Sequence, residues 1–149
     1  MGLKDALDEK LDSWSSDAES ALALVILLDQ FPRNMYRDTP AAFCGDELAR
    51  KYAKTMVLSG KDKELMDNRG HAWCSFVYMP YMHSENLADH EEALKLFDVP
   101  GLLKEISYPY ELAHKEIIDR FGRYPHRNNI LGRQSTPEEI EFLKTNSGF

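Results

Sequence analysis

The sequence has no long hydrophobic run and little cysteine. Its longest apolar run, residues 21–28, is far shorter than the ~20 residues that cross a bilayer, and the charged N-terminus, MGLKDALDEKLDSW, has no apolar signal-peptide core. The two cysteines, Cys44 and Cys74, show no CxxC or Cys/His spacing and fall in apolar segments, which predicts buried thiols in a reducing compartment. We therefore expect a cytoplasmic protein without a membrane partner.

Basic charge and the short motifs of several catalytic sites are also scarce. The chain carries 18 Lys and Arg against 25 Asp and Glu, and its net charge of −7 argues against nucleic acid as a partner. It contains no glycine-rich phosphate loop, no HExxH and no GxSxG. The sequence therefore predicts no nucleotide-binding loop, no zinc-protease or serine-hydrolase site, and no metal or other cofactor.

What the sequence does contain is helical periodicity. With 149 residues, of which 43% are hydrophobic, the chain is long enough for a single domain with its own core, residues 1–149. Apolar residues recur at helical spacing without a strand or hairpin pattern, so we expect an all-α protein of six to eight helices. The expected helices cover about residues 3–12, Ser16 to Pro32, Thr39 to Gly60, Arg69 to Met79, Ser84 to Phe97, Pro109 to Gly122 and a last one from Thr136, with KDKELMDN as a charged loop.

One polar segment, Arg120 to Glu139, is too rich in arginine and rigid turns for a linker. Arginine is suited to bidentate contacts with carboxylates or phosphates, and prolines and glycines hold the backbone between them. Part of this segment is similar to an earlier one. FPRNMYRDTP at 31–40 and YPHRNNILGRQSTP at 124–137 share an aromatic residue followed by proline, an Arg-Asn pair and a Thr-Pro helix start. The corresponding residues are Arg33, Asn34 and Arg37 in the first copy and Arg127, Asn128 and Arg133 in the second.

If the two copies are related, both Arg-Asn pairs could converge on one pocket. Like charges repel there unless an anion or carboxylates lie between them. Two interpretations stay open, because the arginines either tie helix ends to buried carboxylates or hold a small anionic ligand. The candidate acids are Asp29, Glu85, Glu138 and Glu139.

Three separated motifs resemble the DUF924 family, whose members have a tetratricopeptide-like helical fold. The motifs read LALVILLDQFPRNMYR, FVYMPYMHSENLADHEE and IIDRFGRYPHRNNILGRQSTPEEIEFL, and the resemblance covers about residues 20–149. It implies a right-handed array of helical pairs and no particular activity. Residues 1–19 diverge from the family, whose members usually have a longer N-terminal part. The shorter N-terminal part could leave a groove open, which a second copy or a partner chain could cover. His90 stands where the family typically has Gln.

The polar residues of these motifs predict a binding pocket. An imidazole could act as acid or base while an arginine holds an anion, so we expect a site for a small carboxylate or phosphate compound, with acid-base catalysis as an extension. The alternatives are a tetratricopeptide-like scaffold for a peptide or protein partner, and a cluster that only ties helices together. The candidate catalytic residues are His83, Glu85, His114 and His126, and the candidate ligand-binding residues are Asp29, Gln30, Arg33, Asn34, Arg123, Arg127, Asn128 and Arg133.

Overall fold

The structure, a computed structural model, describes residues 2–146 and 148. This part of the chain folds into nine α-helices and contains no strand, so the predicted all-α class is confirmed. None of these helices is both long and apolar enough to cross a membrane. The α-helices are α1 (Leu3–Leu7), α2 (Ala18–Met35), α3 (Asp46–Leu58), α4 (Lys61–Arg69), α5 (His71–Met82), α6 (Leu87–Phe97), α7 (Tyr108–Phe121), α8 (Asn128–Leu131) and α9 (Pro137–Leu143). Shorter turns are the 3-10 helices η1 (Asp12–Ser16), η2 (Pro40–Phe43) and η4 (Pro125–Arg127) and the π-helical turn η3 (Leu103–Ser107).

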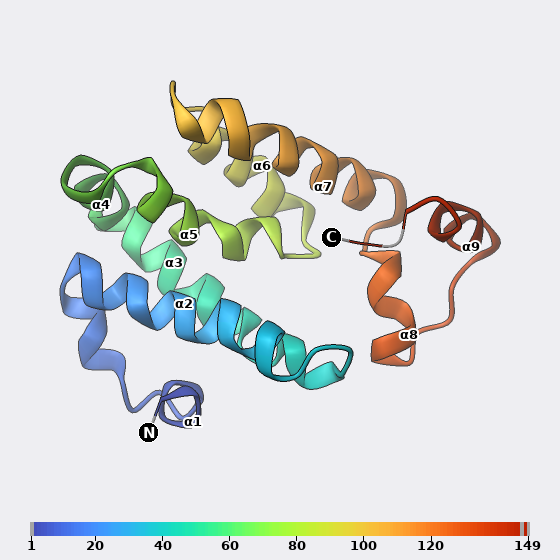
Figure 1. Ribbon diagram of the computed structural model, residues 1–149, viewed down its shortest axis with the longest axis horizontal. Helices are drawn as coiled ribbons and strands as arrows, with labels where there is room; N and C mark the ends of the chain where they lie inside the picture. Colours follow the sequence, from blue (N-terminus) through green and yellow to red (C-terminus); the bar gives the residue numbers. More distant parts are fainter. Residues whose placement is uncertain (1, 147, 149) are drawn as a thin grey trace.

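Helix α2 lies at the centre of the core. Its residues Leu24, Val25 and Leu28 are fully buried, and the helix contacts α1, α3, α4 and α5. Successive helices pack as neighbours, α2 with α3, α4 with α5 and α6 with α7, while α8 and α9 follow α7 at one end of the molecule (Figure 1). The helices thus form successive pairs, and the tetratricopeptide-like handedness of the array stays a prediction.

Two prolines lie inside helices and not at their ends. The sequence predicts a helix end at Pro32, but α2 continues past it, and the amide of Tyr36 donates to the carbonyl of Pro32. Pro80 likewise lies inside α5. A proline removes one helical hydrogen bond, and both rings are buried, which offsets that loss. As a consequence, Arg33 belongs to the last turn of α2 and not to a separate rigid turn.

Two helix caps also differ from the predicted ones. Helix α2 is capped by Asp17, whose carboxylate accepts hydrogen bonds from two amides of the first turn, and not by Ser16. Helix α6 is capped by Asn86. The expected cap of that helix, Ser84, instead donates from its hydroxyl to Asp89 at 2.6 Å. In each case an Asp or Asn side chain closer to the helix accepts from the free amides.

Burial differs from expectation at two places. Cys44 is exposed in the turn that precedes α3, whereas Cys74 is buried as predicted. The segment KDKELMDN is not a loop but forms α4, because it buries Leu65 together with the carboxylate of Asp62. That carboxylate accepts from the hydroxyl of Tyr78 at 2.6 Å. This helix and α8 raise the number of α-helices above the expected six to eight.

The start of α3 touches the backbone of α2 at Gly45. A Cβ atom at this position would lie 2.0 Å from the carbonyl oxygen of Leu28, so only glycine allows the approach. We expect Gly45→Ala to lower the free energy of unfolding by about 2–3 kcal/mol through overpacking. Gly122→Ala, at a left-handed but open position, serves as the control and should cost about 1 kcal/mol. Equal losses in urea unfolding would contradict the close contact.

Candidate functional site

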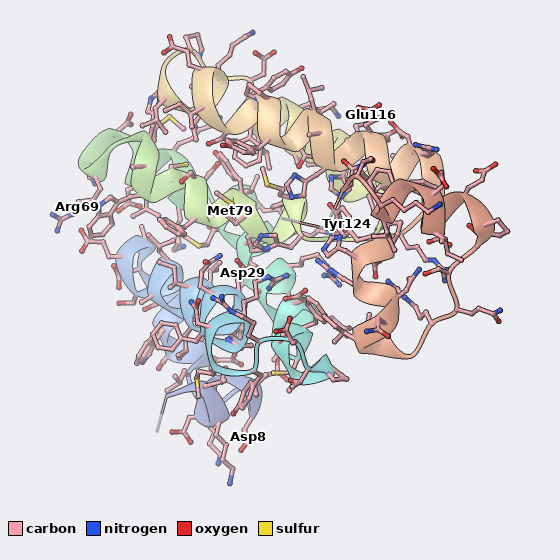
Figure 2. The ribbon with its side chains drawn as sticks, turned by 45° about the vertical axis from the view of Figure 1, so that its right-hand side comes forward. Asp8, Asp29, Arg69, Met79, Glu116 and Tyr124 are labelled. Atoms are coloured by element: carbon pink, nitrogen blue, oxygen red, sulfur yellow. The ribbon has the colours of Figure 1, made fainter. Side chains whose placement is uncertain are left out.

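A cleft of about 720 Å³ opens where the ends of α2 and α5, the turn η2, the start of α7 and the η4–α8 segment meet. Asp29 on α2 and Tyr124, which follows α7, point toward the same part of the interior although they are far apart in the sequence (Figure 2). The π-helical turn η3 adds Ile106 and Ser107 to the lining. The predicted site residues on the lining are Arg33, Asn34, His83, His114, His126 and Arg127.

One carboxylate, Asp46, lies between the two arginines. Arg33 donates to both oxygens of Asp46, at 2.6 and 2.9 Å, and to the backbone carbonyl of Asp29 at 2.8 Å. The guanidinium of Arg127 approaches the same carboxylate only to 3.9 Å. Burial alone would lower the pKa of Arg33, but Asp46 and Asp29 outweigh it and raise the pKa above its ordinary value. Arg33 is therefore a firmly paired cation that helps to shape the cleft.

Arg127 is paired less completely. Its Nη2 donates to the backbone carbonyl of His83 at 2.8 Å, and the guanidinium lies 4.4 and 4.9 Å from the ring centroids of Phe43 and Tyr124. The residue is only 7% exposed, and its Nε has no hydrogen-bond partner among the described residues. Burial lowers the pKa of Arg127, and Asp46 offsets this only in part. A buried guanidinium in this state favours a further acceptor.

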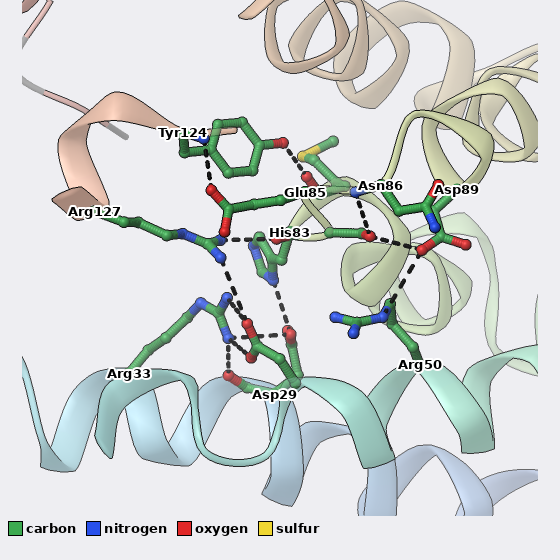
Figure 3. Close-up of polar contacts among 12 residues, drawn as sticks. Asp29, Arg33, Arg50, His83, Glu85, Asn86, Asp89, Tyr124 and Arg127 are labelled. Carbon is green, nitrogen blue, oxygen red and sulfur yellow. Dashed lines mark hydrogen bonds and ion pairs between the residues drawn. The ribbon is translucent and has the colours of Figure 1, made fainter. Parts of the chain in front are cut away.

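His83, directly after α5, is oriented by Asp29. Its Nδ1 lies 2.8 Å from Oδ1 of Asp29 (Figure 3). Burial by itself would raise the pKa of Asp29, but His83 and Arg33 outweigh it and hold the pKa below its ordinary value. The ionised carboxylate only accepts hydrogen bonds, so Nδ1 of His83 carries a proton and donates to it, and this fixes the tautomer in which Nε2 faces away from Asp29. The side chain of His83 is 19% exposed and lines the cleft, where such a pair can transfer protons.

Tyr124 lies among three histidines. Its ring centroid is 6.1, 5.8 and 5.5 Å from those of His90, His114 and His126. Burial lowers the pKa of both His114 and His126 to about 4, so these two rings are neutral at pH 7. Within the part of the chain that the structure describes, no three His, Cys, Asp or Glu side chains gather closely enough to hold a metal ion.

Tyr124 contacts His90, which forms a buried pair with Glu111. Nδ1 of His90 lies 2.5 Å from Oε1 of Glu111, and Nε2 of His90 lies 2.6 Å from the backbone carbonyl of Ser84 and 3.1 Å from the Tyr124 hydroxyl. Burial raises the pKa of Glu111. The carbonyl of Ser84 can only accept, so Nε2 of His90 donates to it, and Nδ1 of His90 shares a hydrogen bond with Glu111. His90, which stands where the family typically has Gln, therefore contacts Tyr124 on the wall of the cleft.

Several predicted residues lie beside the cleft and not on its lining. The Glu85 carboxylate accepts from both Nη atoms of Arg133, at 2.9 and 3.0 Å. Arg123 forms a bidentate pair with Glu139, to which Asn128 also donates at 3.1 Å. Because these charges are already paired, this group ties the segment after α7 to α9 and to the start of α6.

The two similar segments, residues 31–40 and 124–137, do not share a local structure. The pair at 33–34 lies in the last turn of α2, whereas the pair at 127–128 joins η4 to α8. Asn34 donates to the backbone carbonyl of Gln30 at 3.1 Å, and Asn128 donates to a different helix. The two arginines do converge on one carboxylate, but the segments are not a structural repeat.

Sequence reasoning missed two residues of the framework. Asp46 stands at the first position of α3, where an acidic residue is common because it suits the helix dipole, so its sequence context gives no sign of a bridging role. Tyr124 was visible only as half of an aromatic-Pro step. Only the spatial arrangement shows that the Asp46 carboxylate lies between Arg33 and Arg127.

Comparisons with known proteins give a family and no activity. A solved structure of a protein of unknown function, ATU0120 from Agrobacterium tumefaciens, is 38% identical and superposes with a TM-score of 0.87, covering 97% of this chain and 78% of that one. A comparison with curated proteins gives no significant match. The sequence profile described as "Bacterial protein of unknown function (DUF924)" matches residues 2–147, and this range includes the first helices, which the sequence analysis placed outside the resemblance. The chain belongs to the DUF924 family.

Proposed function

We propose that this protein binds a small organic anion in the cleft, with the Arg127 guanidinium as the main contact. The proposal depends above all on one observation: Arg127 is buried on the lining, and the carboxylate nearest to it, Asp46 at 3.9 Å, is already bidentate to Arg33. A carboxylate or phosphate oxygen in the cleft would add an acceptor to this guanidinium, whose present hydrogen bond goes to the carbonyl of His83. Charge-assisted hydrogen bonds of this kind are about twice as strong as neutral ones.

The charges on the lining support an anionic ligand. Arg33, Arg37 and Arg127 line the cleft, and Asp38 is the only acidic residue among its described lining residues. Arg33 is already paired with Asp46 and Asp29, so Arg37 and Arg127 are the lining cations that remain for a ligand, in a chain whose net charge is −7. Such a patch attracts anions and disfavours cations.

The size and the apolar walls indicate what else the ligand contains. A volume of about 720 Å³ falls in the roughly 300–1,000 Å³ range of small-molecule sites. Phe43, Met79, Met82, Ile106 and Ile130 supply apolar surface next to the arginines. These walls favour an acid that carries an apolar body of several carbons over a bare inorganic ion.

A thermal-shift comparison tests this proposal. Adipate, hexanoate, phosphate and sulfate are added at equal ionic strength, and an organic acid at 100 times its Kd should stabilise the fold by about 2.7 kcal/mol. For a chain of this length that corresponds to a rise in Tm of roughly 5–10 °C. Arg127→Lys should abolish most of the rise, because lysine cannot form the planar bidentate contact.

Arg120→Lys is the matched control. Arg120 lies over the rings of Phe121 and Phe142 and is not on the lining of the cleft, so its replacement should leave the ligand response intact. Each variant is compared with its own ligand-free Tm, because Arg127→Lys also removes structural contacts. An equal response in both variants, or no response to any acid, would contradict the proposal and favour the alternative of a peptide-binding groove.

A further inference from the structure

The imidazole of His83 is held in one orientation on the wall of the cleft. Asp29, whose carboxylate binds Nδ1 of His83, is 1% exposed and is itself fixed by Gln30 at 2.7 Å and by Arg33 at 3.3 Å. A buried, ionised carboxylate on Nδ1 sets the tautomer and leaves the lone pair on Nε2. This is the arrangement of a general base that a second residue positions.

The same histidine is tied directly to the proposed anion contact. Arg127 donates from Nη2 to the backbone carbonyl of His83 at 2.8 Å, and both residues line the cleft. An acid bound to Arg127 therefore lies in the same cleft as the imidazole. The rest of a bound molecule extends along the apolar wall that Phe43 and Ile106 help to form.

We propose that Asp29 and His83 form the general base of a hydrolase that cleaves small carboxylic esters bearing a separate anionic group. The inference rests on the proposed anion binding. Among the described residues no serine, threonine or cysteine side chain is hydrogen-bonded to His83, so the base acts on water and not on a protein nucleophile. His83 is the catalytic residue, Asp29 is a positioning residue, and Arg127 holds the anionic group.

The reaction needs water as its only co-reactant. Nε2 of His83 takes one proton from a water molecule while the water oxygen forms a bond to the acyl carbon. The tetrahedral adduct then breaks its bond to the ester oxygen, and the imidazolium returns the proton to the leaving alkoxide. The products are an alcohol and the corresponding acid, and no electron is exchanged with another group.

Two chromogenic esters test the inference. Mono-p-nitrophenyl adipate carries a free carboxylate, whereas p-nitrophenyl hexanoate has an acyl chain of the same length without charge. We expect the adipate ester to be hydrolysed well above the uncatalysed rate and the hexanoate ester to show a much lower kcat/KM. His83→Gln should lower kcat roughly 100-fold or more with little change in KM, since a general base contributes at least that factor. Arg127→Lys should mainly raise KM.

Matched variants separate catalysis from folding. Asp29→Asn should lower kcat by roughly 10-fold or more without raising KM, because the partner that orients a histidine commonly has effects of this size. His71→Gln replaces the histidine at the other end of α5, away from the lining, and should leave kcat and KM unchanged. Circular dichroism and Tm confirm that each variant is folded.

Binding and turnover can fail separately. If adipate stabilises the protein in an Arg127-dependent way but the adipate ester is not hydrolysed, or is hydrolysed equally by His83→Gln, the hydrolase inference is overturned and the binding proposal stands. If p-nitrophenyl phosphate is turned over in place of the adipate ester, the assignment to acyl esters is wrong. If adipate gives no stabilisation at all, the proposed function itself fails.

Discussion

Replacing Asp46 with alanine is expected to lower the free energy of unfolding by about 3–5 kcal/mol. The carboxylate is bidentate to Arg33 and is also the nearest acid to Arg127. The side chains of the three residues are only 10%, 21% and 9% exposed, so water cannot replace the lost partner fully. The two guanidiniums would then face each other in the cleft wall with too little negative charge between them.

Urea unfolding measures this loss, with Asp67→Ala as the control. Asp67 is exposed on α4, and its replacement should change stability by no more than about 0.5 kcal/mol. Adding Arg33→Met to Asp46→Ala should recover part of the loss, because the double variant no longer buries the unpaired cation. Equal stabilities of the Asp46→Ala and Asp67→Ala proteins would show that Asp46 is not the bridge between the arginines.

The second large effect is a loss of stability in mild acid. Burial lowers the pKa of His114 and of His126 from 6.5 to about 4. Between these values the unfolded chain binds more protons than the folded one, so stability is fully present above pH 6.5 and is lost as the pH falls through about 4. At ~1.36 kcal/mol per pKa unit, His114, which is 6% exposed, accounts for roughly 3 kcal/mol, and the more exposed His126 accounts for less.

A carboxylate, Glu139, adds a further loss of stability at lower pH. The hydrogen bonds from Arg123 lower the pKa of Glu139 from 4.5 to about 2. The stability that this pair contributes is present above pH 4.5 and disappears as the pH falls through about 2. The histidine and carboxylate contributions therefore act in two successive windows of pH.

Urea unfolding at pH 7, 5.5 and 4 checks the histidine window. His114→Asn keeps a donor for the backbone carbonyl of Tyr110 but cannot titrate, so its stability should change much less over this range than that of the wild type. His71→Asn should follow the wild type. A stability that stays constant from pH 7 to pH 4 in the wild type would contradict buried, neutral rings on the cleft wall.

The helices were predictable from the sequence because their signals are local. Apolar residues at helical spacing predicted α2, α5 and α7, and the Thr-Pro step predicted the start of α9, where Thr136 and Glu139 accept hydrogen bonds from each other's amides in a capping box. The errors arose where tertiary burial outweighs a local preference. Pro32 and Pro80 remain inside helices because their rings pack in the core, and α4 forms around one buried leucine.

The residues of the site could be predicted from the sequence, but their arrangement in space could not. His83, Arg33 and Arg127 are chemically conspicuous, and the structure brings them together. Glu85 and Arg133 are equally conspicuous, yet they satisfy each other beside the cleft. Which charges are paired with protein groups and which remain open to a ligand depends on distances between helices, and spacing along the chain does not contain that information.

Side-chain NMR of the arginine Nε–H groups shows directly whether the Arg127 guanidinium receives the anion. On titration with adipate, we expect a saturable shift of the Arg127 Nε–H resonance, with little change at Arg120, which lies outside the cleft. An unchanged Arg127 resonance, or equal and unsaturated shifts at every arginine, would contradict an anion site in the cleft.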